Sequence, residues 1–307
     1  MNRTTERITS SIASDKPQTL RMSRRGWAIF LALGLIWGMP YLLIRIAIND
    51  LHPVLVAAGR TAVGALVLLP AALHRRTLSE ALRHWKWLAL YTLVEITAPW
   101  VLIGYAESHV PSSTAGLLIA MTPLIAAVIA TKLGDDRLGR KRLAGLALGF
   151  LGLATIYGLD LGTADAPAVI ALMLSACGYA AGPIILARKL SHVQPIVVVA
   201  ASLIIAFIVY LPFIPFFWPA HVSIASIGAV VFLGVICTAL AFVLLLRLIA
   251  EAGPARSTVV AYVNPAVAIT LGAALLGEAM TIGMGLSFVL IIAGSILAAS
   301  NDSSTRR

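Results

Sequence analysis

The chain has 307 residues, of which 60% are hydrophobic and only 12% are charged. This is more apolar surface than a soluble core can bury, so the composition excludes a soluble domain and indicates a membrane protein. The net charge of +10 is typical of many nucleic-acid-binding proteins. Here, however, the basic residues are scattered over many short segments and form no single patch, so we expect no nucleic-acid partner.

Apolar runs of about 17 to 23 residues can cross a hydrocarbon core of roughly 30 Å as α-helices. Read in chain order, such runs predict an all-α integral membrane protein with ten transmembrane helices. The expected spans are 27–46, 54–73, 87–106, 113–132, 143–159, 168–187, 196–217, 226–247, 257–275 and 282–299. The segments between them are short turns, so no soluble domain is expected between spans.

The two ends of the chain read as cytoplasmic tails. Residues 1–26 begin with a stretch rich in Ser, Thr and mixed charge, which predicts a disordered tail. Residues 300–307 form the second, shorter tail. The first apolar run is too long for the core of a cleaved signal, so we expect it to be retained as a membrane anchor.

The basic residues alternate along the chain in a way that fixes the expected orientation. Of the 23 Lys and Arg residues, 21 fall on one side of the membrane if the ten spans alternate, and the opposite loops hold none. The other two, Arg45 and Arg60, lie within predicted spans. By the positive-inside rule we expect a multi-pass protein of the cytoplasmic (inner) membrane with both termini in the cytoplasm.

The chain contains an internal repeat, and each half carries five predicted spans. The second copy of a five-span unit is inverted in the membrane, which is typical of secondary transporters. We therefore predict a first repeat at 27–159 and a second at 168–299. Three proline pairs share one constant offset and so set the register of the repeat: Pro53 and Pro195, Pro70 and Pro212, and Pro123 and Pro265.

Several segments resemble a known family. "LGLIWGMPYLLIRIAI", "LVAAGRTAVGALVLLP" and "STAGLLIAMTPLIAAVIATKLGDDRLGRKRLAGLALGFLGLA" look like the first half of an EamA-type member of the drug/metabolite transporter superfamily. The second half is echoed by "CTALAFVLLLRLIAEAGPARSTVVAYVNPAVAITLGAALLGEAMT". Asp136 departs from the usual Glu of the first copy, which leaves the expected fold unchanged. The resemblance implies a ten-helix carrier that moves small metabolites, often outward, by alternating access.

Two prolines predict helix breaks near the middle of the membrane. Pro123 and Pro265 each remove one helix hydrogen bond, so carbonyls in the preceding turn lose their partners. Thr122 and Asn264 precede these prolines. Interrupted spans at matching positions of two repeats point to a transport site, so both polar side chains are substrate-binding candidates. Alternatively, each bonds to its own backbone at a packing kink.

Two charged residues are expected inside the membrane. At 1.5 Å per residue, the backbones of Arg60 and Glu95 should differ in depth by about 8 Å, which an arginine side chain can largely bridge as an ion pair. Such charges should face a partner or a water-filled cavity. A pair that only fixes two helices is the alternative. The repeat partners Ser202 and Cys237 carry no charge, which favours a single, asymmetric cavity.

Aromatic residues add to this candidate site. Trp37, Tyr41 and Arg45 lie at i, i+4 and i+8 and so form one helical stripe. Trp37 and Tyr41 are expected to line the cavity or to pack, whereas Arg45 is expected at the membrane interface. Trp100 is deep enough to stack on a ligand.

We predict a secondary-active transporter that exports amino acids or related zwitterions. No G-x-x-x-x-G-K-[ST] segment is present, so the energy is expected to come from a gradient. Arg60 would receive a carboxylate, and Glu95 an ammonium group or a coupling proton.

Proton-coupled efflux of hydrophobic cationic drugs is the alternative. An intramembrane enzyme is disfavoured because no acid-rich magnesium motif, His pair or serine dyad is present. We expect no catalytic residue, cofactor or metal; the expected partners are a small-molecule substrate, protons and membrane lipid, with the oligomeric state left open.

Overall fold

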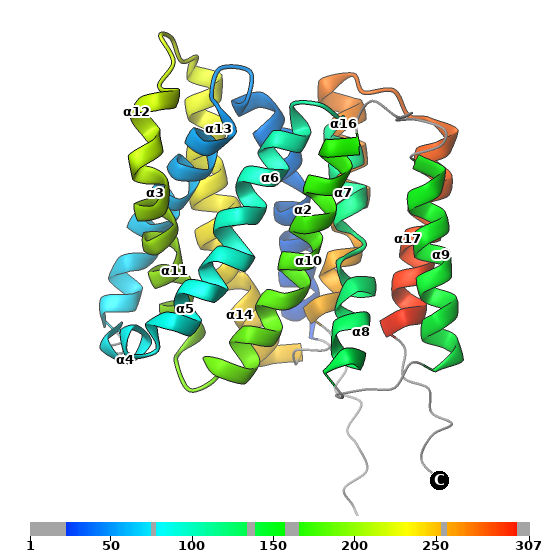
Figure 1. The fold of residues 1–307 in the computed structure, drawn as a ribbon, viewed down its shortest axis with the longest axis horizontal. Coiled ribbons are helices and arrows are strands. Elements are labelled where there is room, and N and C mark those ends of the chain that lie inside the picture. Colours follow the sequence, from blue (N-terminus) through cyan, green and yellow to red (C-terminus); the bar gives the residue numbers. More distant parts are fainter. Residues whose placement is uncertain (1–22, 75–77, 134–138, 157–165, 253–256, 300–307) are drawn as a thin grey trace, which may run out of the picture.

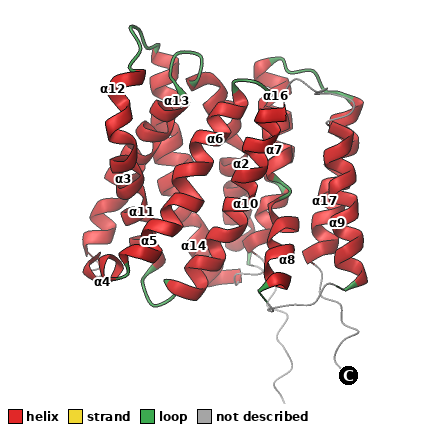
Figure 2. Cartoon of the chain, in the orientation of Figure 1, coloured by secondary structure: helices red, strands yellow, loops and turns green. Residues whose placement is uncertain are grey.

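The computed structural model describes residues 23–74, 78–133, 139–156, 166–252 and 257–299, and every regular element in these residues is a helix (Figure 1, Figure 2). Residues 1–22 and 300–307 of the predicted tails lie outside the described residues. The loop that holds Asp136 also lies outside them. The helices of the first half are α2 (Arg24–Ala47), α3 (Pro53–His74), α4 (Leu78–Arg83), α5 (Trp85–Thr92), the π-helix η1 (Leu93–Thr97), α6 (Ala98–Glu107), α7 (Ser112–Ile119), α8 (Thr122–Lys132) and α9 (Arg140–Ile156).

The second half is helical in the same way. Its elements are α10 (Ala166–Lys189), α11 (Pro195–Tyr210), the 3-10 helix η3 (Leu211–Phe213), α12 (Ile214–Phe217), α13 (Ile224–Gly234), the π-helix η4 (Val235–Leu240), α14 (Ala241–Ala252), the 3-10 helix η5 (Thr258–Tyr262), α16 (Asn264–Leu276) and α17 (Ile282–Ala299).

Among the described residues, seven helical segments, some of them interrupted, are long and apolar enough to cross a membrane. Three shorter apolar helices, Leu143–Thr155, Val260–Leu276 and Ile282–Leu297, coincide with the other three predicted spans. The all-α prediction is therefore confirmed for the described residues, while membrane crossing by the three shorter helices stays a prediction. The seven long segments are Arg24–Ala47, Pro53–Leu73, Trp85–Glu107, Ser112–Lys132, Ala166–Lys189, Pro195–Phe217 and Ile224–Glu251.

The helices are interrupted at positions that recur at the offset of the proline pairs. The two π-helices begin at Leu93 and Val235. Helices α8 and α16 begin at Thr122 and Asn264, each directly after an interruption and with a proline in the first turn. A proline is tolerated there because it lacks the N–H that would remain unpaired in a first turn. The backbone therefore departs from regular helix at the same two places in each half.

Two carboxylates cap helix N-termini on one face of the molecule, which we call the Asp50 face. Asp50 Oδ2 accepts hydrogen bonds from the backbone N–H of Ser223 at 3.0 Å and from Ser226 Oγ at 2.7 Å, at the start of α13. Glu278 accepts from the backbone N–H groups of Ser112 and Ser113, at 2.7 and 3.0 Å, at the start of α7. Negative charge is favoured at these ends because the first N–H groups of a helix have no partner within it.

The opposite face, which we call the His84 face, holds the ends of other helices together. The rings of His84 and His192 lie 4.2 Å apart between their centroids, which joins the start of α5 to the segment between α10 and α11. Ser23 Oγ donates a hydrogen bond to Glu251, which joins the start of α2 to α14. Helix α13 begins and α16 ends on the Asp50 face, seen at the upper edge of the bundle (Figure 1).

The helices pack by pairing the two halves. Helix α17 lies along α9, α11 lies along α3, α10 packs on α6 and α8, and α2 packs on α16 and α13. Between α9 and α17 the backbones approach so closely that a Cβ at Gly294 would lie 2.6 Å from the Gly145 carbonyl oxygen. Small residues permit such close approach of membrane helices. The bundle is thus built from contacts between halves as much as within them.

The Asp50 cap should contribute pH-dependent stability. Hydrogen bonds from Ser223 and Ser226 lower the pKa of Asp50 from 3.8 to about 2. A depressed carboxylate pKa stabilises the fold above the unfolded-state pKa of about 3.9, and this stabilisation is lost as the pH falls toward 2. Asp50→Asn should therefore lower the midpoint of thermal unfolding in detergent at about pH 6 and have a smaller effect near pH 3. A Ser223→Ala variant should show the same trend, and an effect independent of pH would contradict this role.

Candidate functional site

Arg60 lies at the centre of the bundle with its charge held by two partners from different helices. Its side chain on α3 is buried, with 8% of its surface exposed. The guanidinium carbon lies 3.7 Å from the centroid of the Trp100 ring, and Nε donates a hydrogen bond of 2.9 Å to Thr238 Oγ1. A cation over an indole face is favourable, more so when both groups are removed from water. The buried charge is therefore compensated by an aromatic face and a hydroxyl.

Thr238 accepts this bond because it lies in the π-helix η4. Its hydroxyl donates to the carbonyl of Leu233, five residues earlier, at 2.8 Å, which leaves its lone pairs for Arg60. The wider turn of a π-helix frees backbone groups, and such turns are frequent at functional sites. Sequence reasoning missed Thr238; the only signal was a hydroxyl within an otherwise apolar run.

Three tyrosines surround the Arg60–Trp100 pair. Tyr41, predicted from the sequence, and Tyr179 and Tyr210, which were not, all lie close enough to Arg60 to interact with it electrostatically. Tyr179 is also hydrogen-bonded with Trp100. The Tyr210 hydroxyl donates to the carbonyl of Thr97 in η1 at 2.7 Å. Arg60 thus contacts Trp100 and Thr238 directly and interacts electrostatically with three tyrosines.

Glu95 lies in the other π-helix, η1, next to α10. A Cβ at Gly182 of α10 would overlap Glu95 Oε2, so only glycine leaves room for the carboxylate. Oε2 is buried and has no hydrogen-bond partner among the described residues. Glu95 and Arg60 form no ion pair between them, so the pairing considered from depth alone is wrong: Arg60 is held by Trp100 and Thr238.

The polar residues at the two helix breaks bond to backbone carbonyls. Thr122 Oγ1 donates to the carbonyl of Ile119 at 2.6 Å. The Asn264 amide, in the orientation that satisfies both of its ends, donates to the carbonyls of Gly34 on α2 and Val260 at 3.3 and 3.1 Å. Both side chains therefore satisfy groups near the interruptions, as the packing alternative requires. Pro123 and Pro265 lie one residue after them.

Trp37 and Arg45, the other predicted residues of α2, contact different parts of the structure. Trp37 packs edge-to-face on Phe242 of α14, with centroids 6.3 Å apart. Arg45 Nη1, near the Asp50 face, donates a hydrogen bond to the backbone carbonyl of Glu107. Glu107 itself, which the sequence reasoning passed over, is fully buried, and neither carboxylate oxygen has a hydrogen-bond partner among the described residues.

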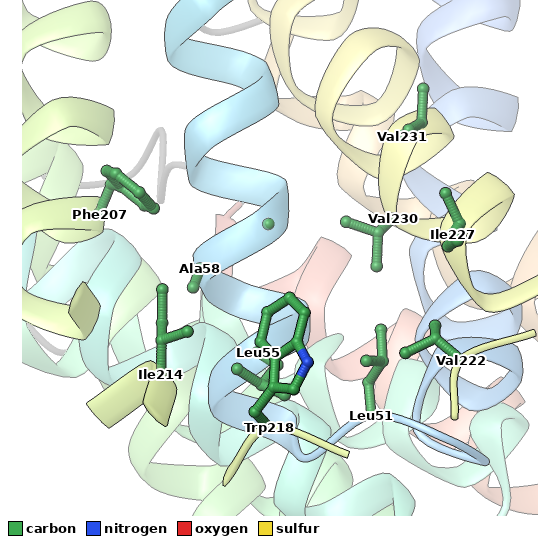
Figure 3. Close-up of a pocket in the computed structure, with 11 residues that line it drawn as sticks. Leu51, Leu55, Ala58, Phe207, Ile214, Trp218, Val222, Ile227, Val230 and Val231 are labelled. Carbon is green, nitrogen blue, oxygen red and sulfur yellow. The ribbon is translucent and has the colours of Figure 1, made fainter. Parts of the chain in front are cut away.

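A separate apolar cavity of about 300 Å³ lies between α3, α11–α12 and α13, toward the Asp50 face (Figure 3). Leu55, Phe207, Trp218 and Val230 are among its lining residues. It contains no charged group that could orient a polar ligand, so the Arg60 region is the better candidate for polar recognition. Among the described residues, no group of three or more His, Cys, Asp or Glu side chains could hold a metal ion.

The apolar helices with a polar, partly charged centre define a multi-pass membrane protein of the transporter class. The EamA-like transporter family model matches the chain twice, at residues 24–158 and 166–300. The chain therefore belongs to this family, within the drug/metabolite transporter superfamily, and the resemblance seen in the sequence is confirmed. Membership implies a small-molecule substrate and a membrane environment.

Relatives over nearly the full length carry transporter names. A "Probable terminal-alkyne amino-acid exporter" of Streptantibioticus cattleyicolor is 25% identical over 93% of this chain and 99% of its own length. The inner membrane transporter YedA of Escherichia coli is 25% identical over 81% of this chain and 82% of its own length. A solved crystal structure, 20% identical, superimposes with a TM-score of 0.64 over 90% of this chain and 98% of that one, which shows a shared fold.

The contact between Gly182 and Glu95 predicts a sensitive position. Gly182→Ala places a methyl group where the carboxylate lies, so we expect Glu95 to be displaced and the transport rate to fall roughly ten- to a hundredfold. Gly228→Ala on α13 is the matched control, because a Cβ there meets nothing within 4 Å. Uptake into proteoliposomes is the measurement, with thermal unfolding as the check on folding. Equal transport by both folded variants would show that the position of Glu95 does not matter.

Proposed function

We propose that the protein is a secondary-active exporter of amino acids or related zwitterions that works by alternating access. The observation that carries the proposal is the presence of two opposite charges that do not pair with each other: Arg60, which is buried, and Glu95, whose Oε2 is buried. Arg60 is held by Trp100 and Thr238, while Glu95 Oε2 has no hydrogen-bond partner among the described residues. A zwitterion presents one group to each.

Arg60 is suited to receive a carboxylate. Its Nε bond to Thr238 is the only hydrogen bond that the guanidinium makes to described residues, which leaves both Nη groups available. Two parallel N–H donors match the two oxygens of a carboxylate. Trp100 fixes the plane of the guanidinium, so little side-chain entropy is lost when the ligand binds. We assign Arg60 as the anion-binding residue and Trp100 as its support.

Glu95 is assigned to the ammonium group or to a coupling proton. An ionised carboxylate without a hydrogen-bond partner is costly in a low-dielectric site, so it favours a cation or a proton as its partner. Trp37, Tyr41, Thr122 and Asn264 complete the proposed substrate-binding set. Thr122 and Asn264 would reach the substrate by exchanging their backbone bonds when the helix breaks at Pro123 and Pro265 change.

For alternating access we propose ten spans in two inverted five-helix repeats, 27–159 and 168–299. Three observations support this. The family model matches twice, from residue 24 and from residue 166. The two π-helices are separated by the same number of residues as the two matches, and so are the two helix breaks. We further propose that both termini lie in the cytoplasm, that the Asp50 face is the outer one in a cytoplasmic (inner) membrane, and that basic residues collect on the His84 face.

Two observations bear on the direction and the class of substrate. A relative that covers nearly the whole chain is named as an amino-acid exporter. The unpartnered Oε2 of Glu95 would equally suit the positive charge of a hydrophobic cation, which keeps proton-coupled drug efflux as the second candidate. The two candidates differ in whether Arg60 contacts the substrate.

Replacing Arg60 separates them. Arg60→Lys keeps the positive charge but loses the planar pair of donors, so export of amino acids should fall roughly tenfold or more. If the protein carries cationic dyes, the protection of cells against these dyes should change little in Arg60→Lys. The measurement is a growth-protection and proteoliposome screen with both substrate classes. Transport of dyes alone, unchanged in Arg60→Lys, would replace the amino-acid proposal by the drug candidate.

Glu95 should couple transport to protons. In proteoliposomes with a pH gradient and no substrate gradient, the wild type should accumulate substrate, whereas Glu95→Gln should exchange substrate without accumulating it. The amide has nearly the same shape but cannot release a proton at these pH values. Glu95→Asp is the matched variant, because it restores a titratable group. Accumulation by Glu95→Gln equal to that of the wild type would remove the proton role.

A further inference from the structure

Glu107, at the end of α6 on the Asp50 face, is a buried carboxyl group that the proposed substrate site does not use. Its exposed fraction is 0%, and neither of its oxygens accepts a hydrogen bond from a described residue. Its nearest cation, Arg45, donates to the Glu107 backbone carbonyl. An ionised carboxylate buried without hydrogen bonds carries a large desolvation cost, and binding a proton removes most of it.

The charges around Glu107 come from several elements. Helix α2 contributes Arg45 and Tyr41, the segment after α16 contributes Glu278, and all three interact with Glu107 electrostatically. Helix α7, packed against α6, has no titratable side chain. Arg45 favours the ionised form of Glu107, whereas Glu278 opposes it.

Glu278 is the carboxylate of this pair that stays ionised. Burial alone would raise its pKa, but the hydrogen bonds from the hydroxyl and backbone of Ser113 and from the backbone of Ser112 outweigh burial and leave the pKa below its ordinary value. A fixed negative charge close to Glu107 favours a proton on Glu107, because two ionised carboxylates at close range repel each other. The two acids thus have different tasks: Glu278 caps α7, and Glu107 is left to take up a proton.

Two buried tyrosines lie between Glu107 and Glu95 in a series of electrostatic interactions. Tyr41 interacts electrostatically with Glu107 and with Tyr179 of α10, and Tyr179 interacts with Glu95. Arg60 of α3 lies beside both tyrosines. Helix α6, which carries Glu107, packs against α2 with Tyr41 and against α10 with Tyr179, and α10 also packs against η1, which carries Glu95. Ionisable residues within membrane-spanning segments commonly form proton relays, and a tyrosine hydroxyl can both accept and donate a proton.

We propose that Glu107 is a second proton-binding site, at the end of a path that runs from Glu95 through Tyr179 and Tyr41 to the Asp50 face. A proton taken up from the Asp50 face would rest on Glu107 and then pass along the hydroxyls to Glu95, and each transfer conserves one proton. The direction of the path rests on the proposed function. Proton binding at Glu107 does not, since it follows from burial and contacts alone.

Infrared spectroscopy of the full-length protein in liposomes tests the binding step. The C=O stretch of a protonated carboxyl group is separate from the carboxylate bands, so each acid can be followed across a pH titration. We expect one protonated-carboxyl band that disappears in Glu107→Gln and persists in Glu95→Gln. Identical spectra of the wild type and Glu107→Gln over the whole titration would overturn the proposal. Loss of a band in Glu95→Gln alone would support the role of Glu95 and still reject that of Glu107.

Two further measurements keep the test independent of folding and of transport. Covalent modification by a hydrophobic carbodiimide, mapped by mass spectrometry in the unmutated protein, should label Glu107 and should decrease as the pH rises; absence of the adduct at every pH would contradict the proposal. Tyr41→Phe should keep the Glu107 band but slow proton uptake into proteoliposomes, measured without substrate because Tyr41 also belongs to the proposed substrate-binding set, with Tyr105→Phe, on the exposed side of α6, as the matched control. Equal uptake rates in the two variants would reject the path.

Discussion

Every backbone N–H and C=O group in the hydrocarbon region must find its partner within the protein, and the rest of this structure depends on that constraint. Regular helices meet it automatically, but this chain departs from regular helix at Leu93–Thr97, at Val235–Leu240 and before Thr122 and Asn264. Each departure frees carbonyls that hydroxyl and amide side chains then satisfy. Polar residues are therefore concentrated where the helices are irregular, and this is also where the candidate site lies.

The two halves share a backbone plan but not a set of side chains. Both contain a π-helix in the third predicted span and a break in the fourth, at the constant offset of the internal repeat. Yet Glu95 of the first π-helix corresponds to Cys237, and Arg60 corresponds to Ser202. A symmetric scaffold can interconvert two equivalent conformations, whereas binding one asymmetric solute requires unlike groups on its two sides. Recognition is therefore assigned to the residues that break the repeat.

The energetics of the buried cation explain why Arg60 needs no carboxylate beside it. Trp100 and Thr238 compensate the charge with an aromatic face and one hydroxyl, so the guanidinium keeps donors that a salt bridge would have occupied. Glu95 Oε2 and both carboxylate oxygens of Glu107 have no hydrogen-bond partner among the described residues. Their carboxyl groups can respond to a substrate or a proton, which a fully paired carboxylate could do only by first breaking its pair.

The sequence by itself determined the membrane class, the approximate extents of the helices and the breaks at Pro123 and Pro265, because hydropathy and proline geometry act over a few neighbouring residues. It also predicted that the backbones of Arg60 and Glu95 differ in depth by only about 8 Å, since rise per residue is fixed. Depth does not determine which way a side chain points. Only the tertiary structure decided that Arg60 meets Trp100 and Thr238, that α10 approaches closely enough to require Gly182, and that Glu107 is buried. Those outcomes depend on the rotation and crossing of helices far apart in the chain, which no local pattern encodes.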